Sequence, residues 1–244
     1  MKEKIEVTYI DRNVRREEEV CVIAERSLVL RVNGSMAADF LYTPGDEREL
    51  VAGHCFAEGW ISGWDDVVSL EVEAGRAEVV LRKAPEKDGN GKQGDFPGLR
   101  EEEIKTMVTG LEVTPGELSA MLDKMEQAQA LGEQTRASHA VSLFARDGRM
   151  VVVREDAGRH NAFDKAIGFA LMRGEDMSGM TAVLSSRISY EMALKAYRAG
   201  IQIMAGVSAA TALAVKLGRA VDLTIAGRLR GDSMLVYSGG HRIV

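Results

Sequence analysis

The chain has 244 residues and a net charge of −6, and 45% of its residues are hydrophobic. This composition supports a full core and excludes a largely disordered protein. No apolar run approaches the length of a membrane helix, and the N-terminus lacks the apolar segment of an export signal, so we expect a cytoplasmic protein. The two cysteines exclude a disulfide framework and a cysteine-rich zinc site, and the acidic balance argues against non-specific binding to nucleic acid.

Charge is unevenly distributed along the chain. Residues 150–244 carry 12 Lys and Arg against 8 Asp and Glu, whereas residues 1–149 carry 19 against 29. A site for an anionic ligand is therefore expected in the C-terminal part.

The first half of the chain is predicted to be mainly β-strand. Residues 19–31 have the pattern of one β-branched strand, and Asn33-Gly34 is typical of a hairpin turn before a second strand at 36–42. A helix is predicted over 45–58, because proline and acidic residues crowd its first turn. Two strands at 66–82, a mobile loop at 84–100 and a helix at 117–130 complete this half.

From residue 138 the pattern changes to short strands that alternate with helices. Predicted strands lie at 139–144, 150–153, 180–184, 201–205, 223–226 and 234–237, and predicted helices at 161–172, 190–199 and 209–217, the last closed by Gly218. This alternation indicates an α/β layer with a mixed, largely parallel sheet. We expect a smaller β-rich N-terminal domain over 1–134 and an α/β domain over 135–244.

The predicted strand ends share a composition that points to a ligand. Open α/β sheets bind ligands at the carboxyl ends of their strands. Small or polar residues precede a helix or turn in four such segments, 154–161, 185–189, 206–208 and 227–233. Three of them contain arginine, and helix N-termini add free N–H groups, so we infer a phosphate-bearing ligand. The alternative is that Ser189 and Ser208 are ordinary helix caps and that the arginines are solvated.

Two histidines stand near these strand ends. His139 begins a predicted strand, and a lone histidine in that place is either structural or a ligand contact. His160 lies between Arg159 and Asn161 at a helix start, and this tripeptide has no apolar role, which favours a ligand contact.

Paired or buried roles are expected for four other reactive side chains. Asp164 and Lys165, in the first turn of the predicted helix, either pair with neighbouring charges or cap the helix. Cys55 lies inside an apolar helix and Cys21 among β-branched residues, so both are expected to pack as buried thiols. Neither has the electropositive setting of a reactive cysteine.

Common catalytic motifs are missing from the sequence. It has no Walker A sequence, no GxGxxG fingerprint and no GxSxG elbow. The zinc-deaminase pattern also fails, because Val141 stands where its glutamate is required and there is no cysteine pair. The sequence therefore predicts no metal of its own.

Several segments resemble the FdhD/NarQ family of formate dehydrogenase accessory proteins. The most specific runs from Arg154 to Lys165, REDAGRHNAFDK, close to that family's R-E-D-V-G-R-H-N-A-L-D-K. Shorter matches extend the resemblance over about residues 20–240: Val32-Asn33-Gly34, Tyr42-Thr43-Pro44-Gly45-Asp46, Gly53, Glu58-Gly59, His139-Ala140, Ser185-Ser186-Arg187, Glu191, Arg230-Gly231 and Val236-Tyr237.

The resemblance implies a homodimer and a C-terminal domain similar to the cytidine deaminase fold without its zinc site. Members of the family carry sulfur from a cysteine desulfurase to the molybdenum bis(pterin guanine dinucleotide) cofactor of formate dehydrogenase. The resemblance also implies that the cofactor binds at Arg228, Leu229, Arg230, Gly231, Asp232 and Ser233. We add as candidate cofactor contacts the strand-end residues His139, Arg159, His160, Asn161, Ser185 and Arg187, and GDP is the fragment that mimics the cofactor.

One departure from the family concerns sulfur transfer. The family's persulfide cysteine lies in a CxxC-type loop between the helix at 45–58 and His139, but residues 59–138 of this chain contain no cysteine. A persulfide requires a thiolate, so no catalytic residue is assigned, and Cys55 is the alternative thiol. Near the C-terminus the family's Gly-Gly-Arg becomes Gly231-Asp232-Ser233, in which the carboxylate suits a guanine or a sugar hydroxyl better than a phosphate.

Three functions remain open. The first is a cofactor-binding maturation factor without the sulfurtransferase step, serving formate dehydrogenase or a related molybdoenzyme. The second is an active sulfur carrier that uses Cys55 or a partner's thiol and receives sulfur from a cysteine desulfurase. The third is an unrelated nucleotide-handling enzyme with His160 or His139 as its base.

Overall fold

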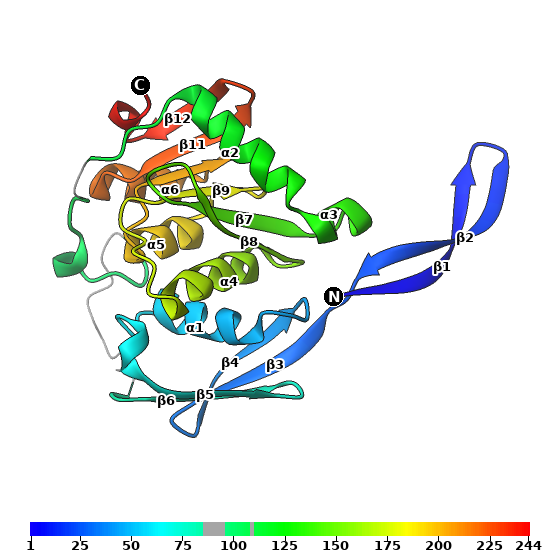
Figure 1. Cartoon of the computed structure of the whole chain (residues 1–244), viewed down its shortest axis with the longest axis horizontal. Coiled ribbons are helices and arrows are strands. Elements are labelled where there is room, and N and C mark those ends of the chain that lie inside the picture. Colours follow the sequence, from blue (N-terminus) through cyan, green and yellow to red (C-terminus); the bar gives the residue numbers. More distant parts are fainter. Residues whose placement is uncertain (85–95, 108–109) are drawn as a thin grey trace.

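The computed structural model describes residues 1–84, 96–107 and 110–244. Most of the predicted loop at 84–100 therefore lies outside the described residues. In Figure 1 the body of the molecule is layered, and a long two-stranded arm projects from it. Among the described residues, no helix has the length and apolar character needed to cross a membrane.

A mixed six-stranded sheet forms the centre of the body. Its strands are β7 (His139–Phe144), β8 (Met150–Asp156), β9 (Thr181–Leu184), β10 (Ile203–Gly206), β11 (Thr224–Arg230) and β12 (Ser233–Ser238), in the order β12-β11-β10-β9-β7-β8. Strands β9, β10 and β11 pair parallel with one another, whereas the pairs β11–β12, β7–β9 and β7–β8 are antiparallel. The mixed sheet is confirmed, but its parallel part is smaller than the alternation of strands and helices predicts, because β7 and β12 pair antiparallel with their neighbours.

Both faces of this sheet are buried by helices. Helices α4 (Arg159–Met172), α5 (Tyr190–Arg198) and α6 (Ala212–Val221) cover one face, and α2 (Pro115–Gln127) covers the other (Figure 1). Successive side chains alternate between the two sides, as a pleated strand requires. Val183 packs in the cluster on the α2 side, whereas Ala182 and Leu184 pack with α4, α5 and α6.

A smaller sheet lies beyond the helical layer. Strands β3 (Arg26–Val32), β4 (Ser35–Tyr42), β5 (Val67–Glu73) and β6 (Arg76–Leu81) form it in the order β4-β3-β6-β5, and α1 (Glu47–Ala57) lies between it and α4. The predicted hairpin turn is confirmed, since Asn33 and Gly34 both have positive φ, at 49° and 79°. Three short 3₁₀ turns lie at Trp64–Asp66, Glu101–Glu103 and Gly240–Arg242.

Two glycines set the contact between α1 and α4. A Cβ atom on Gly53 would overlap the backbone carbonyl of Asp164, and one on Gly168 would overlap that of Glu49. The helices therefore touch backbone to backbone. This close contact joins the N-terminal sheet to the helical layer of the larger sheet.

The strand predicted at 19–31 is two strands. Strand β2 (Val14–Ile23) pairs with β1 (Lys2–Asp11) in the projecting arm, and β3 begins at Arg26 in the body. Ala24 is buried at the junction, and its N–H donates to the carbonyl of Met1 at 2.9 Å. The sequence pattern gives no sign of this break, because β-branched residues are favoured in both strands.

The helix predicted at 117–130 is also two helices. Thr114 caps α2, because its Oγ1 accepts from the N–H of Glu117 at 3.1 Å while the Glu117 carboxylate accepts from the N–H of Thr114 at 2.7 Å. The non-helical ψ of Gln129, 74°, separates α2 from α3 (Ala130–Thr135). The domain boundary at residue 134 stays a prediction, although α2 lies before it and packs on the six-stranded sheet.

Gly218 does not end a helix as predicted but lies within α6. A Cβ there would lie 2.5 Å from the Ser238 hydroxyl and 2.8 Å from Ile225 Cδ1, so the glycine allows α6 to approach β11 and β12 closely. The helix instead ends at Val221, and the next residue, Asp222, caps it with a left-handed φ of 59°.

The close contact between α1 and α4 predicts that one added methyl group lowers the stability of the fold strongly. Gly168→Ala should lower the free energy of unfolding by about 3 kcal/mol, because overpacking against the Glu49 carbonyl outweighs any gain in helix propensity. Gly63→Ala is the matched control, since a Cβ there meets nothing within 4 Å. Urea unfolding of both variants tests this, and equal midpoints would contradict the backbone contact.

Candidate functional site

The four predicted strand-end segments lie along one edge of the six-stranded sheet. Strands β9, β10 and β11 end at this edge, and β7 begins there because it is antiparallel to β9. The pairing of His139 with Asp156 brings the end of β8 to the same place. Ser185 connects the segments directly, since its Oγ accepts from the N–H of Ala140 at 2.8 Å.

Asp156, at the end of β8, organises the first of these segments. Its carboxylate is fully buried, and the Lys165 Nζ lies 2.8 Å from its Oδ2. The backbone N–H groups of Thr43 and Gly158 and the side-chain amide of Asn161 donate to the same carboxylate at 2.9–3.0 Å. A buried carboxylate with four donors is fully satisfied, so Asp156 holds the fold rather than a ligand.

Other polar residues of this segment are also used by the fold. Arg154 donates to both carboxylate oxygens of Glu49, at 2.5 and 3.0 Å. Glu155 accepts from two backbone N–H groups at the start of α3, at 2.7 and 2.9 Å. The amide nitrogen of Asn161 also donates to the carbonyl of Leu41 at 2.7 Å, so its donors are already engaged.

Arg159 and Arg187 bring positive charge to the edge beside two histidines. Burial lowers the pKa of His139, and the charges of Arg159 and Arg187 lower it further. Burial also lowers the pKa of His160, together with the charges of Lys195 and Arg159. Both imidazoles are therefore mostly neutral at pH 7 and can donate one hydrogen bond each, while the guanidinium groups carry the charge.

Arg159 places a donor without an acceptor at this edge. The Nε of Arg159 is buried and has no hydrogen-bond partner among the residues that the structure describes. Arg159 is also the first residue of α4, whose N-cap Gly158 offers no side chain to the free N–H groups of the first turn. A bound anion would satisfy both, so these residues fit a phosphate group.

A buried ion pair lies next to His160. Lys195 Nζ lies 2.5 Å from Asp164 Oδ1, and His54 Nδ1 lies 3.6 Å from Oδ2. Burial alone would raise the pKa of Asp164, but the charge of Lys195 and the hydrogen bond from His54 lower it. Of the two roles predicted for Asp164 and Lys165, pairing with neighbouring charges is confirmed.

The β11–β12 turn carries the residues that the family resemblance assigns to the cofactor. Arg228 and Arg230 are exposed, and the turn residues Gly231, Asp232 and Ser233 are exposed as well. Arg230 Nη1 donates to the carbonyl of Val207 at 3.1 Å, which ties the turn to the end of β10. The side chain of Leu229 is fully buried, so this residue can meet a ligand only through its backbone.

The two thiols have different surroundings. Cys55 is 1% exposed, and burial with the nearby Asp164 charge raises its pKa to about 12. The predicted buried thiol is confirmed, and at pH 7 it is almost entirely protonated. Cys21 lies on β2 of the arm and is only half-buried, contrary to the expectation of a packed thiol, because β1 and β2 form a sheet of two strands that projects from the body.

Two cavities lie at opposite edges of the six-stranded sheet. One, of about 640 Å³, touches the candidate site through Ser185 and Val207 and is also lined by Glu126, Glu133 and Arg136 from the region of α2 and α3. The other, of about 960 Å³, lies at the opposite edge, where β9 and β10 begin, and none of the predicted site residues lines it.

The Asp156–Lys165 pair predicts a strong dependence of stability on one lysine. Lys165→Met should lower the free energy of unfolding by about 3–5 kcal/mol, because it leaves a buried carboxylate without its counter-charge. Arg149→Met, which removes the exposed pair of Arg149 with Glu175 at 3.9 Å, should cost less than about 1 kcal/mol. The free energies of unfolding are measured in denaturant. Equal losses in the two variants would show that the buried pair stabilises the fold no more than the exposed pair does.

Comparison with known proteins agrees with the resemblance seen in the sequence. The family model of the FdhD/NarQ family matches residues 23–244, which leaves most of the arm outside it. The sulfur carrier protein FdhD of Mycobacterium tuberculosis is 36% identical over 262 residues, covering 96% of this chain and 94% of that protein. The sulfur carrier protein FdhD of Streptomyces avermitilis is 34% identical over 249 residues, covering 91% and 88%.

A solved structure has the same fold. A putative formate dehydrogenase accessory protein from Desulfotalea psychrophila superimposes with a TM-score of 0.85 at 23% identity, covering 100% of this chain and 99% of that one. The implied likeness to cytidine deaminases stays a prediction. The family match over nine-tenths of the sequence, with relatives above 30% identity, shows that the chain belongs to the FdhD/NarQ family.

Proposed function

We propose that this protein is an accessory factor in the maturation of formate dehydrogenase or a related molybdoenzyme, and that it binds the molybdenum bis(pterin guanine dinucleotide) cofactor as cargo. Family membership supports the accessory role. The observation that carries the binding site is the buried, unpartnered Nε of Arg159 at the edge where four strand ends meet.

The chemistry of this edge suits a pyrophosphate. Arg159 and Arg187 supply permanent charge, and the first turn of α4 supplies free backbone N–H groups. Neutral His139 and His160 add hydrogen-bond donors without adding charge. An anion with several acceptor oxygens would use donors that the scaffold leaves available.

The β11–β12 turn is proposed to hold the guanosine end of the cofactor. Asp232 is exposed beside Gly231, whose φ of 51° shapes the turn. A carboxylate is negatively charged, so it repels phosphate. Because it accepts hydrogen bonds and donates none, it suits the N–H edge of guanine or the hydroxyls of ribose. Arg228 and Arg230 precede Asp232 on β11 and would meet the phosphates.

Sulfur carriage is the second candidate function. The curated relatives bear the name sulfur carrier protein, and a cysteine desulfurase would be the donor. Cys55 is a poor carrier, because its thiol is buried and its pKa is about 12. Sulfur carriage by this chain would therefore require Cys21 or a thiol of a partner protein.

The cofactor proposal predicts guanine-nucleotide binding at the strand-end edge. In calorimetric titrations we expect saturable binding of GDP, stronger than that of ADP. Arg159→Gln and Arg230→Ala should each weaken it roughly tenfold or more, since each removes charge-assisted hydrogen bonds. Arg146→Gln is the matched control, because Arg146 lines the cavity at the opposite edge, and it should leave GDP binding unchanged.

The absence of saturable GDP binding would reject this site. So would a loss of GDP affinity in the Arg146→Gln variant as large as that in the Arg159→Gln and Arg230→Ala variants. The same samples test the nucleotide-handling alternative. Recovery of unchanged GDP with and without divalent metal is expected, and conversion that depends on His139 or His160 would favour an enzyme instead.

The burial of Cys55 predicts the outcome of a sulfur-transfer assay. After incubation with a cysteine desulfurase and sulfur-labelled cysteine, wild type and Cys55→Ala should carry equal label, because a buried, protonated thiol does not attack a persulfide. Cys21→Ala is the control for the second thiol. Loss of label in the Cys55→Ala variant would establish Cys55 as the carrier and overturn this prediction.

A further inference from the structure

The cavity of about 640 Å³ beside the strand-end edge contains hydrogen-bond donors that the described part of the chain does not use. Ser185 lines it, and its Oγ accepts from the N–H of Ala140 at 2.8 Å, so the hydroxyl proton is available to a ligand. Arg136 also lines it, and its guanidinium forms no hydrogen bond or ion pair with any residue that the structure describes. The cavity therefore offers a positive charge and a hydroxyl donor.

The backbone of Arg136 has a conformation that arginine rarely adopts. Its φ of 53° and ψ of 24° are left-handed, and a residue with a Cβ atom is less stable there than glycine. Arg136 caps α3 and donates its N–H to the carbonyl of Gly132 at 2.9 Å. A cation at a helix C-terminus is favourable, but the effect is small for an exposed side chain on a helix of six residues. Stability of the fold therefore does not explain an arginine at this position, and such strain is typical of a functional site.

The chain on both sides of Arg136 is tied to the strand-end edge. The Glu155 carboxylate, near the end of β8, accepts from the N–H groups of Leu131 and Gly132 at 2.9 and 2.7 Å. The same carboxylate accepts from the Ser138 hydroxyl at 2.7 Å. Glu155 thus holds the residues before and after Arg136, so the guanidinium is kept beside the cavity.

Two carboxylates on the cavity wall limit where an anion can bind. Glu126 on α2 and Glu133 on α3 also line the cavity, and neither forms an ion pair with the arginine in the described structure. Since they repel an anion, a phosphate group is expected at the end of the cavity lined by Ser185 and Val207. The carbonyl of Val207 accepts from the arginine at the end of β11 at 3.1 Å, so this end adjoins the β11–β12 turn.

We propose that this cavity is a phosphate subsite of the strand-end edge, in which Arg136 and the Ser185 hydroxyl bind a phosphate group of the nucleotide ligand. An arginine is permanently charged and can bond two phosphate oxygens at once. The inference rests on the proposed function, because it concerns the same ligand. It adds Arg136, a residue outside the set that the family resemblance implies.

Calorimetric titration of the full chain with GDP tests the subsite. Arg136→Gln should raise the dissociation constant roughly tenfold or more, because the charge is lost. Arg136→Lys should lose less affinity, since it keeps the charge and loses only the paired donors. Added salt should weaken GDP binding by a smaller factor in Arg136→Gln than in the wild type, because one screened charge pair is missing.

Arg136→Gly separates binding from folding. Glycine accepts the left-handed backbone without a Cβ penalty, so this variant should unfold at a urea concentration no lower than that of the wild type. Its affinity for GDP should nevertheless fall as far as that of Arg136→Gln.

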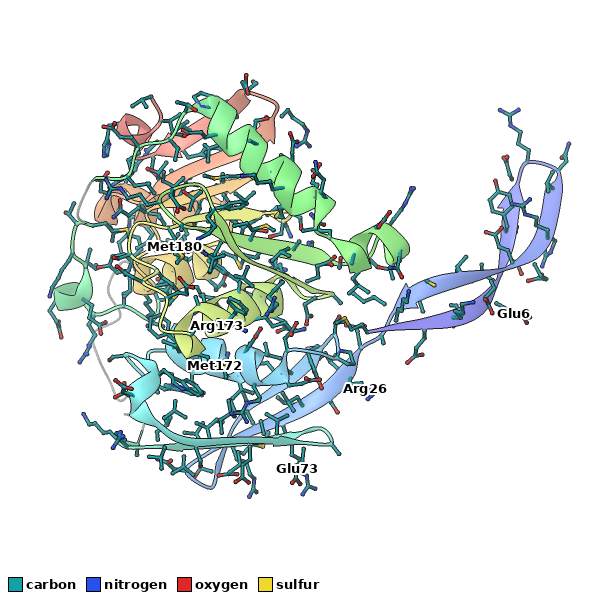
Figure 2. All side chains as sticks on the ribbon, in the orientation of Figure 1. Glu6, Arg26, Glu73, Met172, Arg173 and Met180 are labelled. Atoms are coloured by element: carbon teal, nitrogen blue, oxygen red, sulfur yellow. The ribbon has the colours of Figure 1, made fainter. Side chains whose placement is uncertain are left out.

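Two other arginines provide matched controls. Arg12 also has a left-handed φ, 48°, but it lies in the turn between β1 and β2. Arg146 lines the larger cavity at the opposite edge of the sheet. Met180, which lines that larger cavity and is labelled in Figure 2, lies toward the end of the body opposite to α3. Arg12→Gln and Arg146→Gln should both bind GDP like the wild type.

An Arg136→Gln variant that binds GDP like the wild type, while Arg159→Gln loses affinity, would overturn the subsite and leave the proposed function standing. A loss in either control as large as that in Arg136→Gln would also overturn it, because the effect would be one of net charge. So would a lowered urea midpoint in Arg136→Gly, which would show that the arginine supports the fold. A wild type that does not bind GDP would reject the proposed function and this subsite with it.

Discussion

The buried carboxylate of Asp156 joins three parts of the molecule. Its donors come from the loop after β4, from the turn before α4 and from α4 itself. Removed from water, a carboxylate needs every one of these donors, so the positions of the three parts are fixed relative to one another. This one buried group therefore helps to fix the geometry of the strand-end edge.

This constraint also explains how one charged segment serves two purposes. In REDAGRHNAFDK, the groups of Arg154, Asp156 and Lys165 are neutralised in buried or half-buried pairs. Arg159 remains at the start of α4 with its Nε unpartnered among the described residues. The scaffold thus uses the inward-facing charges of this segment, and Arg159 is left at the edge, where an anion would meet it.

Much of the fold could be predicted from local patterns. The strand at 139–144 matches β7 at both ends, and the Asn33-Gly34 turn is where the sequence places it. Local patterns fail where two elements prefer the same residues, as at the β2–β3 junction and between α2 and α3. They also fail at Gly218, whose role is packing against another element, because a helix-ending glycine and a contact glycine look alike in a sequence.

The sequence by itself determined the composition of the candidate site, because arginines, histidines and small residues at strand ends are a local pattern. It also determined that Cys55 is buried, since an apolar helix surrounds it. Only the tertiary structure decided which charges are free, because pairing depends on partners distant in sequence, such as Thr43 with Asp156 or Lys195 with Asp164. It alone also separated the arm from the body, since strands of the same composition differ only in what packs against them.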